Sequence, residues 1–212
     1  SNVVQKHIEY AVSQKIPCVL VNSYSDKLPS VLSDNRKGAY LAGRYLIEHG
    51  HKTVALLAGV RSYLSNQERT AGFLQAFQEE GLSIPPELIL ETGSWLYDAA
   101  EKVCLNFFNT YTGEMPTALF AFNDRLATGA INAICKTGRT VPDDVSVIGY
   151  DNLGYYNIIS PRITTVETHI EAISESTVMH MIWQLNNGSC LPVKVLTPVE
   201  VISGETVRSL LC

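Results

Sequence analysis

The sequence predicts an α/β protein with doubly wound parallel sheets, and three observations support this prediction. Short, continuously apolar segments alternate with longer segments whose apolar residues recur at helical spacing. Several of the helical segments end at a glycine, which is typical of a helix C-terminus. The 212 residues are 46% apolar and 17% charged, so the chain can bury a sizeable core. Continuously apolar strands that alternate with helices belong in parallel sheets covered by helices on both faces.

The first half of the chain opens on a helix. Val4, Ile8, Ala11 and Val12 recur at helical spacing before the apolar run at 16–21. After that helix, each apolar run predicts a strand, and each periodic segment that ends at a glycine predicts a helix. The expected elements are a strand at 17–21, a short strand at 31–32, a helix at 37–49 closed by Gly50, a strand at 53–58 and a helix at 67–80 closed by Gly81.

The second half repeats this alternation, and the same two patterns predict its elements. The expected elements are a strand at 88–90, a helix at 97–108, a strand at 117–122, a helix at 125–137 closed by Gly138, a strand at 146–149, a long helix at 170–185, and closing strands at 193–196 and 199–202.

Charge and cysteine usage exclude several classes of protein. The 16 basic and 21 acidic residues give a net charge of −5 without a Lys/Arg cluster, so this stretch is a poor nucleic-acid binder by itself. The widely spaced, odd-numbered cysteines favour reduced thiols in a cytoplasmic protein over disulfides or a zinc site. They are Cys18, Cys104, Cys135, Cys190 and Cys212. Neither a membrane-spanning run nor a signal-peptide pattern is present, so the chain as given is expected to be neither exported nor membrane-bound.

The motifs of common enzyme classes are missing from the sequence. It contains no G-x-S-x-G, G-x-G-x-x-G, Walker or H-E-x-x-H pattern, and its five histidines are scattered. We therefore expect no catalytic residue, no metal site and no cofactor.

Polar side chains follow several of the predicted strands. In doubly wound sheets, ligands bind outside the carboxyl ends of the strands, so these side chains should share one crevice. They are Ser65, Arg69, Trp95, Asn123 and Asp151. Amides and carboxylates bind hydroxyl pairs, a guanidinium donates several hydrogen bonds, and an indole covers the apolar face of a sugar ring. The set predicts a neutral, polyhydroxylated ligand.

Two of these positions, and Asp124 beside a third, also fit local structural roles. Ser65 and Glu68 have the spacing of a capping box, so Ser65 is a helix cap or a ligand contact. Arg69 falls in the first turn of the predicted helix, where the helix dipole disfavours a cation, so a carboxylate neighbour or a ligand must offset its charge. Asp124 opens the next helix and is expected to be its cap or a partner of its dipole, which leaves Asn123 as the hydrogen-bonding candidate.

Two further positions have alternative interpretations. Trp95 follows Gly93 and Ser94 in a loop and is either a core residue or a ligand contact. Asp151 ends a buried strand, where an unpaired carboxylate is costly, so it needs a partner from the ligand or from the protein.

Ordered sequence blocks extend over nearly the whole chain. They are SDNRKGAYLA at 33–42, LIEHGH at 46–51, ERTAGF at 68–73, PTALF at 116–120 with Asn123 and Asp124, VPDDVSVIGYDN at 141–152, and ITTV at 163–166. Together these blocks resemble the lactose-repressor/galactose-repressor (LacI/GalR) family of bacterial transcription regulators, in its effector-binding and dimerisation core.

The resemblance implies a two-lobed, type I periplasmic-binding-protein-like fold. By the resemblance, the chain crosses between the lobes near Gly50, near 166–170 and near 197–198. Residues 1–49 and 170–197 would then form an incomplete first lobe, and residues 51–166 and 198–212 the second. The family's effector contacts fall on Ser65, Arg69, Trp95, Asn123 and Asp151, and Tyr63 is a further candidate on the same loop.

The resemblance also implies partners and a mechanism. A small effector, a sugar or alternatively a purine, would bind between the lobes and switch a homodimer between operator-binding and released states. Operator DNA would be bound only through an N-terminal head that, like the first strands of the first lobe, is absent from this chain. An exported sugar-binding protein of a transporter, which has the same fold, is the alternative, and the residues before Ser1 would distinguish the two.

Overall fold

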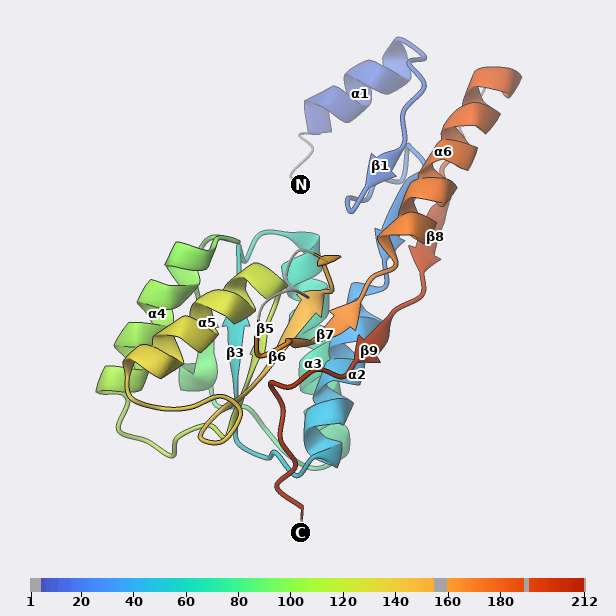
Figure 1. The fold of residues 1–212 in the computed structure, drawn as a ribbon. Coiled ribbons are helices and arrows are strands. Elements are labelled where there is room, and N and C mark those ends of the chain that lie inside the picture. Colours follow the sequence, from blue (N-terminus) through green and yellow to red (C-terminus); the bar gives the residue numbers. More distant parts are fainter. Residues whose placement is uncertain (1–4, 155–159, 189–190, 212) are drawn as a thin grey trace.

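The computed structural model describes residues 5–154, 160–188 and 191–211, and it contains two separate β-sheets (Figure 1). The smaller sheet is parallel, in the order β1-β2-β8, with β1 at Leu20–Val21, β2 at Ser30–Ser33 and β8 at Lys194–Thr197. The larger sheet has the order β4-β3-β5-β6-β7-β9, with β3 at Val54–Ala58, β4 at Ile89–Glu91, β5 at Ala118–Ala121, β6 at Ser146–Asp151, β7 at Thr164–Glu167 and β9 at Glu200–Ile202. Val4, Cys190 and Cys212, which entered the sequence predictions, lie outside the described residues.

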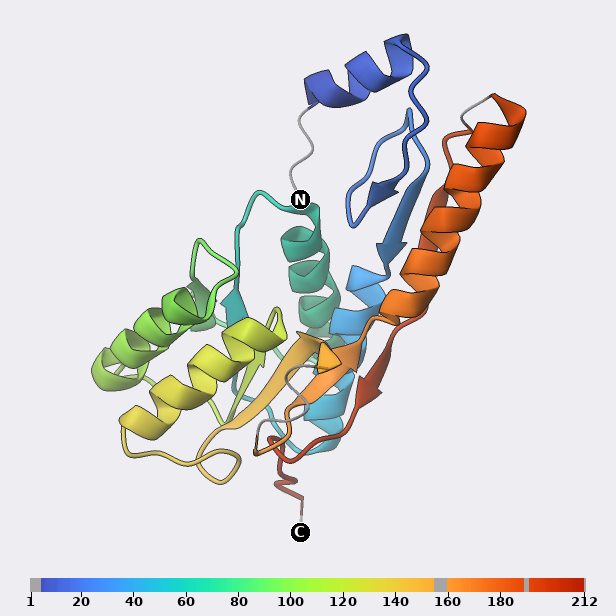
Figure 2. The ribbon, with the colours of Figure 1, turned by 45° about the horizontal axis from the view of Figure 1, so that its top comes forward.

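Helices cover both faces of the larger sheet (Figures 1 and 2). On one face lie α2 (Asn35–Glu48) and α3 (Leu64–Glu79), and on the other lie α4 (Tyr97–Thr110) and α5 (Asp124–Lys136), while a 3-10 turn at Pro86–Leu88 precedes β4. The smaller sheet is accompanied by α1 (Gln5–Ser13) and α6 (Ile170–Asn187). We call α1, α6 and the smaller sheet the small lobe, and the remainder the large lobe. The predicted doubly wound α/β architecture is confirmed.

The chain leaves the small lobe earlier than the sequence predicted. A crossing near Gly50 would have placed the helix at 37–49 in the first lobe. Instead α2 packs against α3 and the larger sheet, where Ala39, Ala42 and Leu46 are completely buried in the large apolar core. The first crossing therefore lies between β2 and α2. The chain passes between the sheets again between β7 and α6 and between β8 and β9.

Strand β7 (Thr164–Glu167) was missed in the sequence because three of its four residues are polar. It pairs with β6 in parallel and with β9 in antiparallel register, so the larger sheet, which is otherwise parallel, ends in one antiparallel edge strand. Thr164 and Thr165 are buried, and their hydroxyls are satisfied by tertiary partners. The Thr164 hydroxyl accepts a hydrogen bond from Gly204 N at 3.0 Å, and the Thr165 hydroxyl donates to Asp124 at 2.6 Å.

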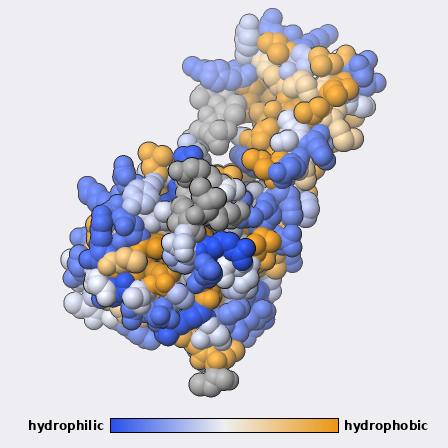
Figure 3. Space-filling view, in the orientation of Figure 1, coloured by the Kyte–Doolittle hydropathy of each residue, from blue (hydrophilic) through white to orange (hydrophobic). Residues whose placement is uncertain are grey.

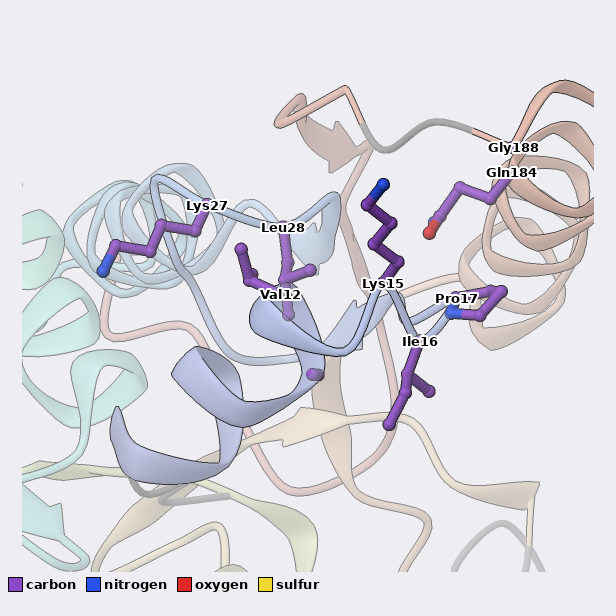
Figure 4. Close-up of a pocket in the computed structure, with 9 residues that line it drawn as sticks. Val12, Lys15, Ile16, Pro17, Lys27, Leu28, Gln184 and Gly188 are labelled. Atoms are coloured by element: carbon purple, nitrogen blue, oxygen red, sulfur yellow. The ribbon is translucent and has the colours of Figure 1, made fainter.

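The small lobe has a small core of its own, formed by Ile8, Leu20 and Leu28. The buried amide of Gln184 on α6 bonds both backbone groups of Cys18, accepting from its N–H at 3.1 Å and donating to its carbonyl at 3.0 Å. Beside this contact, a cavity of about 320 Å³ lies between α1 and the end of α6 (Figure 4).

Large apolar side chains are exposed on α6, and Figure 3 shows apolar residues gathered over the small lobe. The α6 residues are Ile170, Val178, Met179, Ile182, Trp183 and Leu185. In the described part of the chain, every helix is too short or too polar to span a membrane. Cys18, Cys104 and Cys135, the cysteines that the structure describes, are free.

Candidate functional site

A cavity of about 270 Å³ opens beside the carboxyl ends of strands from both sheets. Its lining residues are Asn22, Asn35, Tyr63, Ser65, Arg69, Trp95, Asn123 and Asp151. Asn22 follows β1 of the small lobe, and the other residues belong to the large lobe. The structure thus brings together all six residues that the sequence singled out, and it adds Asn22 and Asn35.

Arg69 is buried and held from several directions. Its Nε donates to Asn35 Oδ1 at 2.9 Å, and its guanidinium also donates to the carbonyl oxygen of Phe122. Its Nη2 lies 3.2 Å from Asp151 Oδ1, and its Cζ lies 3.6 Å from the centroid of the Tyr150 ring. These contacts fix the orientation of the guanidinium, so that Arg69 and Asp151 present a preorganised charge pair to the cavity.

The first turn of α3 differs from the prediction. The helix begins at Leu64 and its N-cap is Tyr63, so the capping box of Ser65 and Glu68 does not form. Within the described part of the chain, the Ser65 hydroxyl has no hydrogen-bond partner, which leaves it available to a ligand in the cavity. Arg69 lies in the second turn, not the first, because the helix starts three residues earlier than expected.

Asp151 ends β6 in an unusual backbone conformation. Its φ is +102° and that of Asn152 is +50°, a region that non-glycine residues rarely adopt and that is often found at functional sites. Burial raises the pKa of the Asp151 carboxyl, and the neighbouring Arg69 guanidinium opposes that rise. The partner that the sequence left open, ligand or protein, is the protein's own Arg69.

Asn123 caps α5, and Asp124 lies in the first turn of the helix, so of its two predicted roles the structure leaves that of a dipole partner. The backbone of Asn123 is extended, as an N-cap requires, and its Oδ1 accepts from Leu126 N at 2.7 Å. Its Nδ2 donates to the carbonyl oxygen of Trp95 at 3.3 Å. One side chain therefore caps a helix, holds the loop that carries Trp95, and lines the cavity.

Trp95 packs against the core and also lines the cavity, so the structure is compatible with both predicted roles, core residue and ligand contact. A Cβ at Gly59 would lie 2.6 Å from Trp95 Cε3, so only glycine lets the indole settle at the end of β3. The Tyr63 ring centroid lies 6.0 Å from that of Trp95. The two rings give the polar cavity an aromatic wall suited to the apolar face of a ring-shaped ligand.

The match to a family model decides the family. The model of the periplasmic binding protein-like domain matches residues 44–207. The chain belongs to this family. The two-lobed fold that the sequence resemblance implied is thereby confirmed.

Curated relatives and a solved structure extend this finding. The chain is 30% identical to ExuR of Bacillus subtilis (strain 168), described as a probable HTH-type transcriptional repressor, over 99% of this chain and 63% of ExuR. It is 33% identical to the HTH-type transcriptional repressor PurR of Pasteurella multocida (strain Pm70), over 92% of this chain and 58% of PurR. The structure of a dimeric Lac repressor superposes with a TM-score of 0.81 at 26% identity, over 92% of this chain and 70% of that one. The resemblance to LacI-family regulators is confirmed, and the chain spans about three fifths of the length of these two curated relatives.

A second cavity of about 480 Å³ adjoins the first in this member of the family. Both are lined by Asn22 and Asp151, and α6 contributes apolar walls at Ile170, Ile173 and Val178. Among the described residues, no three His, Cys, Asp or Glu side chains are grouped closely enough to hold a metal ion. The polar groups on the walls are suited to hydrogen bonding with an organic ligand.

The sequence reasoning missed Asn22 and Asn35, although its own rule could have found both. Asn22 directly follows β1, and Asn35 lies two residues after the end of β2. The rule that ligands bind beyond strand ends applies to these two strands as well. Both strands are short, so their ends were not considered as ligand-binding positions. Asn35 was also overlooked because the first crossing between the lobes was expected near Gly50.

Asp124 gives the protein's stability a pH dependence of its own. Burial raises the pKa of its carboxyl from 3.8 to about 7. Between these values the folded state holds a proton that the unfolded state has lost, so the free energy of unfolding falls as the pH rises. This group should lower that free energy by about 2 kcal/mol between about pH 5 and pH 7. We expect Asp124→Asn to remove this decline in urea unfolding curves recorded across the range.

Asp144→Asn is the matched control. Asp144 also accepts from a backbone N–H and a threonine hydroxyl, both of Thr140, but it is exposed and its hydrogen bonds lower its pKa. Its pH profile should run parallel to that of the wild type in this range. A parallel profile for Asp124→Asn would contradict the prediction.

Proposed function

We propose that this chain is the effector-binding and dimerisation core of a transcriptional repressor, controlled by a small polar ligand bound between the two lobes. The observation that carries the proposal is the pair formed by the buried Arg69 and the half-buried Asp151, which faces a cavity with Trp95 in its wall. A fixed guanidinium, a carboxylate, amides and an indole on one wall form a recognition site for a ring that carries hydroxyl groups.

The lobe division supports a closing movement. We assign residues 5–33 and 170–197 to the small lobe, which is the predicted first lobe, and residues 35–167 and 200–211 to the large lobe, which is the second. Asn22 lines the cavity from the small lobe and Asp151 lines it from the large lobe, so a ligand that contacts both residues favours the closed arrangement of the lobes. A coupling of about 1–3 kcal/mol between ligand binding and lobe angle is enough for a useful switch.

The ligand is proposed to be a sugar, with a purine as the alternative that the same aromatic, guanidinium and carboxylate groups could hold. No catalytic step is assigned to the chain, because its curated relatives are repressors and its site is accounted for by binding alone. The cellular location that suits such a repressor is the cytoplasm. The same relatives favour a regulator over an exported binding protein of a transporter.

The proposed partners are a second copy of the chain and operator DNA. The dimeric Lac repressor has the same fold, which supports a homodimer. The net charge of −5 is unfavourable for DNA, so operator contact is assigned to a part of the protein outside these 212 residues.

A thermal-shift screen tests the proposal. The probes are D-ribose, D-glucose, D-galactose, glucose 6-phosphate, adenine and hypoxanthine. One of them, at about 100 times its dissociation constant, should raise the melting temperature by about 5 °C. The chain has two tryptophans, so in Trp183→Phe the emission reports on Trp95 alone and should change with the same compound.

Trp95→Phe is the control for the emission experiment. Its remaining tryptophan, Trp183, lies on α6 outside the 270 Å³ cavity, and its emission should not respond. A compound that stabilises the protein but leaves Trp95 emission unchanged would place the binding site elsewhere. Stabilisation by none of the probes would contradict both the sugar and the purine assignment.

A further inference from the structure

Asp124 lies behind the candidate site, and the ligand-binding role proposed above does not explain it. It is 1% exposed and does not line the cavity. Since Asn123 caps α5, the carboxyl of Asp124 is not needed as a cap. Burying a carboxyl group is costly unless its oxygens are hydrogen-bonded, so the contacts of Asp124 show what it holds.

These contacts join three neighbouring segments of the larger sheet. Oδ1 accepts from the Thr165 hydroxyl of β7 at 2.6 Å, and Oδ2 accepts from Leu153 N at 3.2 Å, just after β6. A Cβ at Gly149 would lie 2.3 Å from Asp124 Oδ1, so the glycine in β6 makes room for the carboxyl. The side chain thus connects the start of α5 to β7 and to the segment that follows β6.

The contact with Leu153 bears directly on the candidate site. Leu153 lies two residues after Asp151, and the φ angles of +102° at Asp151 and +50° at Asn152 turn the chain sharply between them. At the other side of this turn, the Thr168 hydroxyl donates to the Asp151 carbonyl at 3.2 Å. Fixing the Leu153 amide fixes the turn, and the turn determines where the Asp151 side chain leaves the strand.

We propose that Asp124 is a positioning residue, whose carboxyl holds the 151–153 turn so that Asp151 meets Arg69. The effect on a ligand rests on the proposed function of the site, but the effect on the turn does not. Asp151 is the titratable group that faces Asp124, and its own partner is Arg69.

Amide hydrogen exchange without any ligand tests this proposal. Asp124→Ala should speed exchange at the Leu153 amide about tenfold, because one hydrogen bond to a buried acceptor is lost. Asp124→Asn keeps an acceptor oxygen, while its amide group can donate to Thr165, and should restore protection to within about threefold of wild type. Amides in β5 and β3 should stay protected in both variants, and Asp144→Ala should match the wild type throughout.

Unchanged exchange at Leu153 in Asp124→Ala would overturn the proposal, and so would equal exchange in the alanine and asparagine variants. If Asp124→Ala does not fold, Thr165→Val serves instead, because it removes one anchor of the carboxyl and keeps a strand-forming residue. It should speed Leu153 exchange about threefold, and wild-type exchange would overturn the proposal.

A second measurement separates this proposal from that of the ligand. If one of the probe compounds stabilises the wild type, its dissociation constant should rise about tenfold in Asp124→Ala and stay within about threefold in Asp124→Asn. Equal affinity in all three proteins would show that the turn does not position Asp151 for binding, which overturns that part of the inference. If no probe binds the wild type, the proposed function fails, while the exchange result still decides the role of Asp124.

Discussion

Arg69→Ala should lower the free energy of unfolding by about 3–5 kcal/mol and abolish effector binding. The substitution removes the partner of Asp151 and leaves a largely buried carboxylate unpaired. It also removes the donors to Asn35 and to the Phe122 carbonyl. Urea unfolding measures the first effect and calorimetric titration with a stabilising probe measures the second.

The cost of Arg69→Ala should also depend on pH. With its guanidinium partner gone, the pKa of the Asp151 carboxyl rises further, so protonation relieves the unpaired charge in acid. The destabilisation relative to the wild type should therefore be smaller at about pH 5 than at about pH 7.

Arg61→Ala is the matched control for Arg69→Ala. The Arg61 side chain is 83% exposed and lies 3.6 Å from Glu91, and such surface pairs contribute little. Its unfolding curve should superpose on that of the wild type. If Arg69→Ala were as stable as Arg61→Ala, the Arg69–Asp151 pair would not exist as described.

Gly72→Ala should lower the free energy of unfolding by about 3 kcal/mol, the upper end of the usual cost of overpacking. A Cβ at this position would lie 2.0 Å from the carbonyl oxygen of Arg36, so α2 and α3 would have to move apart. At an unhindered helix position, the same substitution would stabilise the protein by about 1 kcal/mol. Because Asn35 on α2 holds Arg69 on α3, the separation should also weaken ligand binding.

Gly154→Ala is the control for stability, because a Cβ there would meet no atom of the described residues within 4 Å. Chemical unfolding of the two variants beside the wild type makes the comparison. A Gly72→Ala protein with wild-type stability would contradict the close contact between the helices.

Local patterns were sufficient for most elements and for the choice of site residues. Apolar runs and glycine stops located the helices and, except for β7, the strands of the larger sheet, because each pattern lies within a few neighbouring residues. The six site residues followed from one topological rule, that ligands bind beyond the carboxyl ends of the strands, together with the family resemblance. The charge and the missing catalytic motifs could likewise be taken directly from the sequence.

Contacts between distant segments determined the features that the sequence did not predict, namely the strand at 164–167 and the lobe that contains α2. The strand at 164–167 could not be recognised from its polar residues, because its buried threonines are satisfied by Gly204 and Asp124. The lobe to which α2 belongs depends on the sheet that its apolar face packs against. The periodic pattern of α2 predicts an apolar face, but it does not identify that sheet.

The roles at helix starts were decided in the same way. Ser65 fits a capping pattern, but α3 begins one residue before it, and α5 is capped by Asn123, which leaves Asp124 in the first turn. The sequence by itself determined the order of elements and the chemistry available at the strand ends. Only the tertiary structure decided that Arg69 pairs with Asp151 and that Asp124 holds the turn behind them. The physical reason is that burial and hydrogen-bond geometry depend on residues brought together by the fold, whereas periodicity depends only on neighbours in the chain.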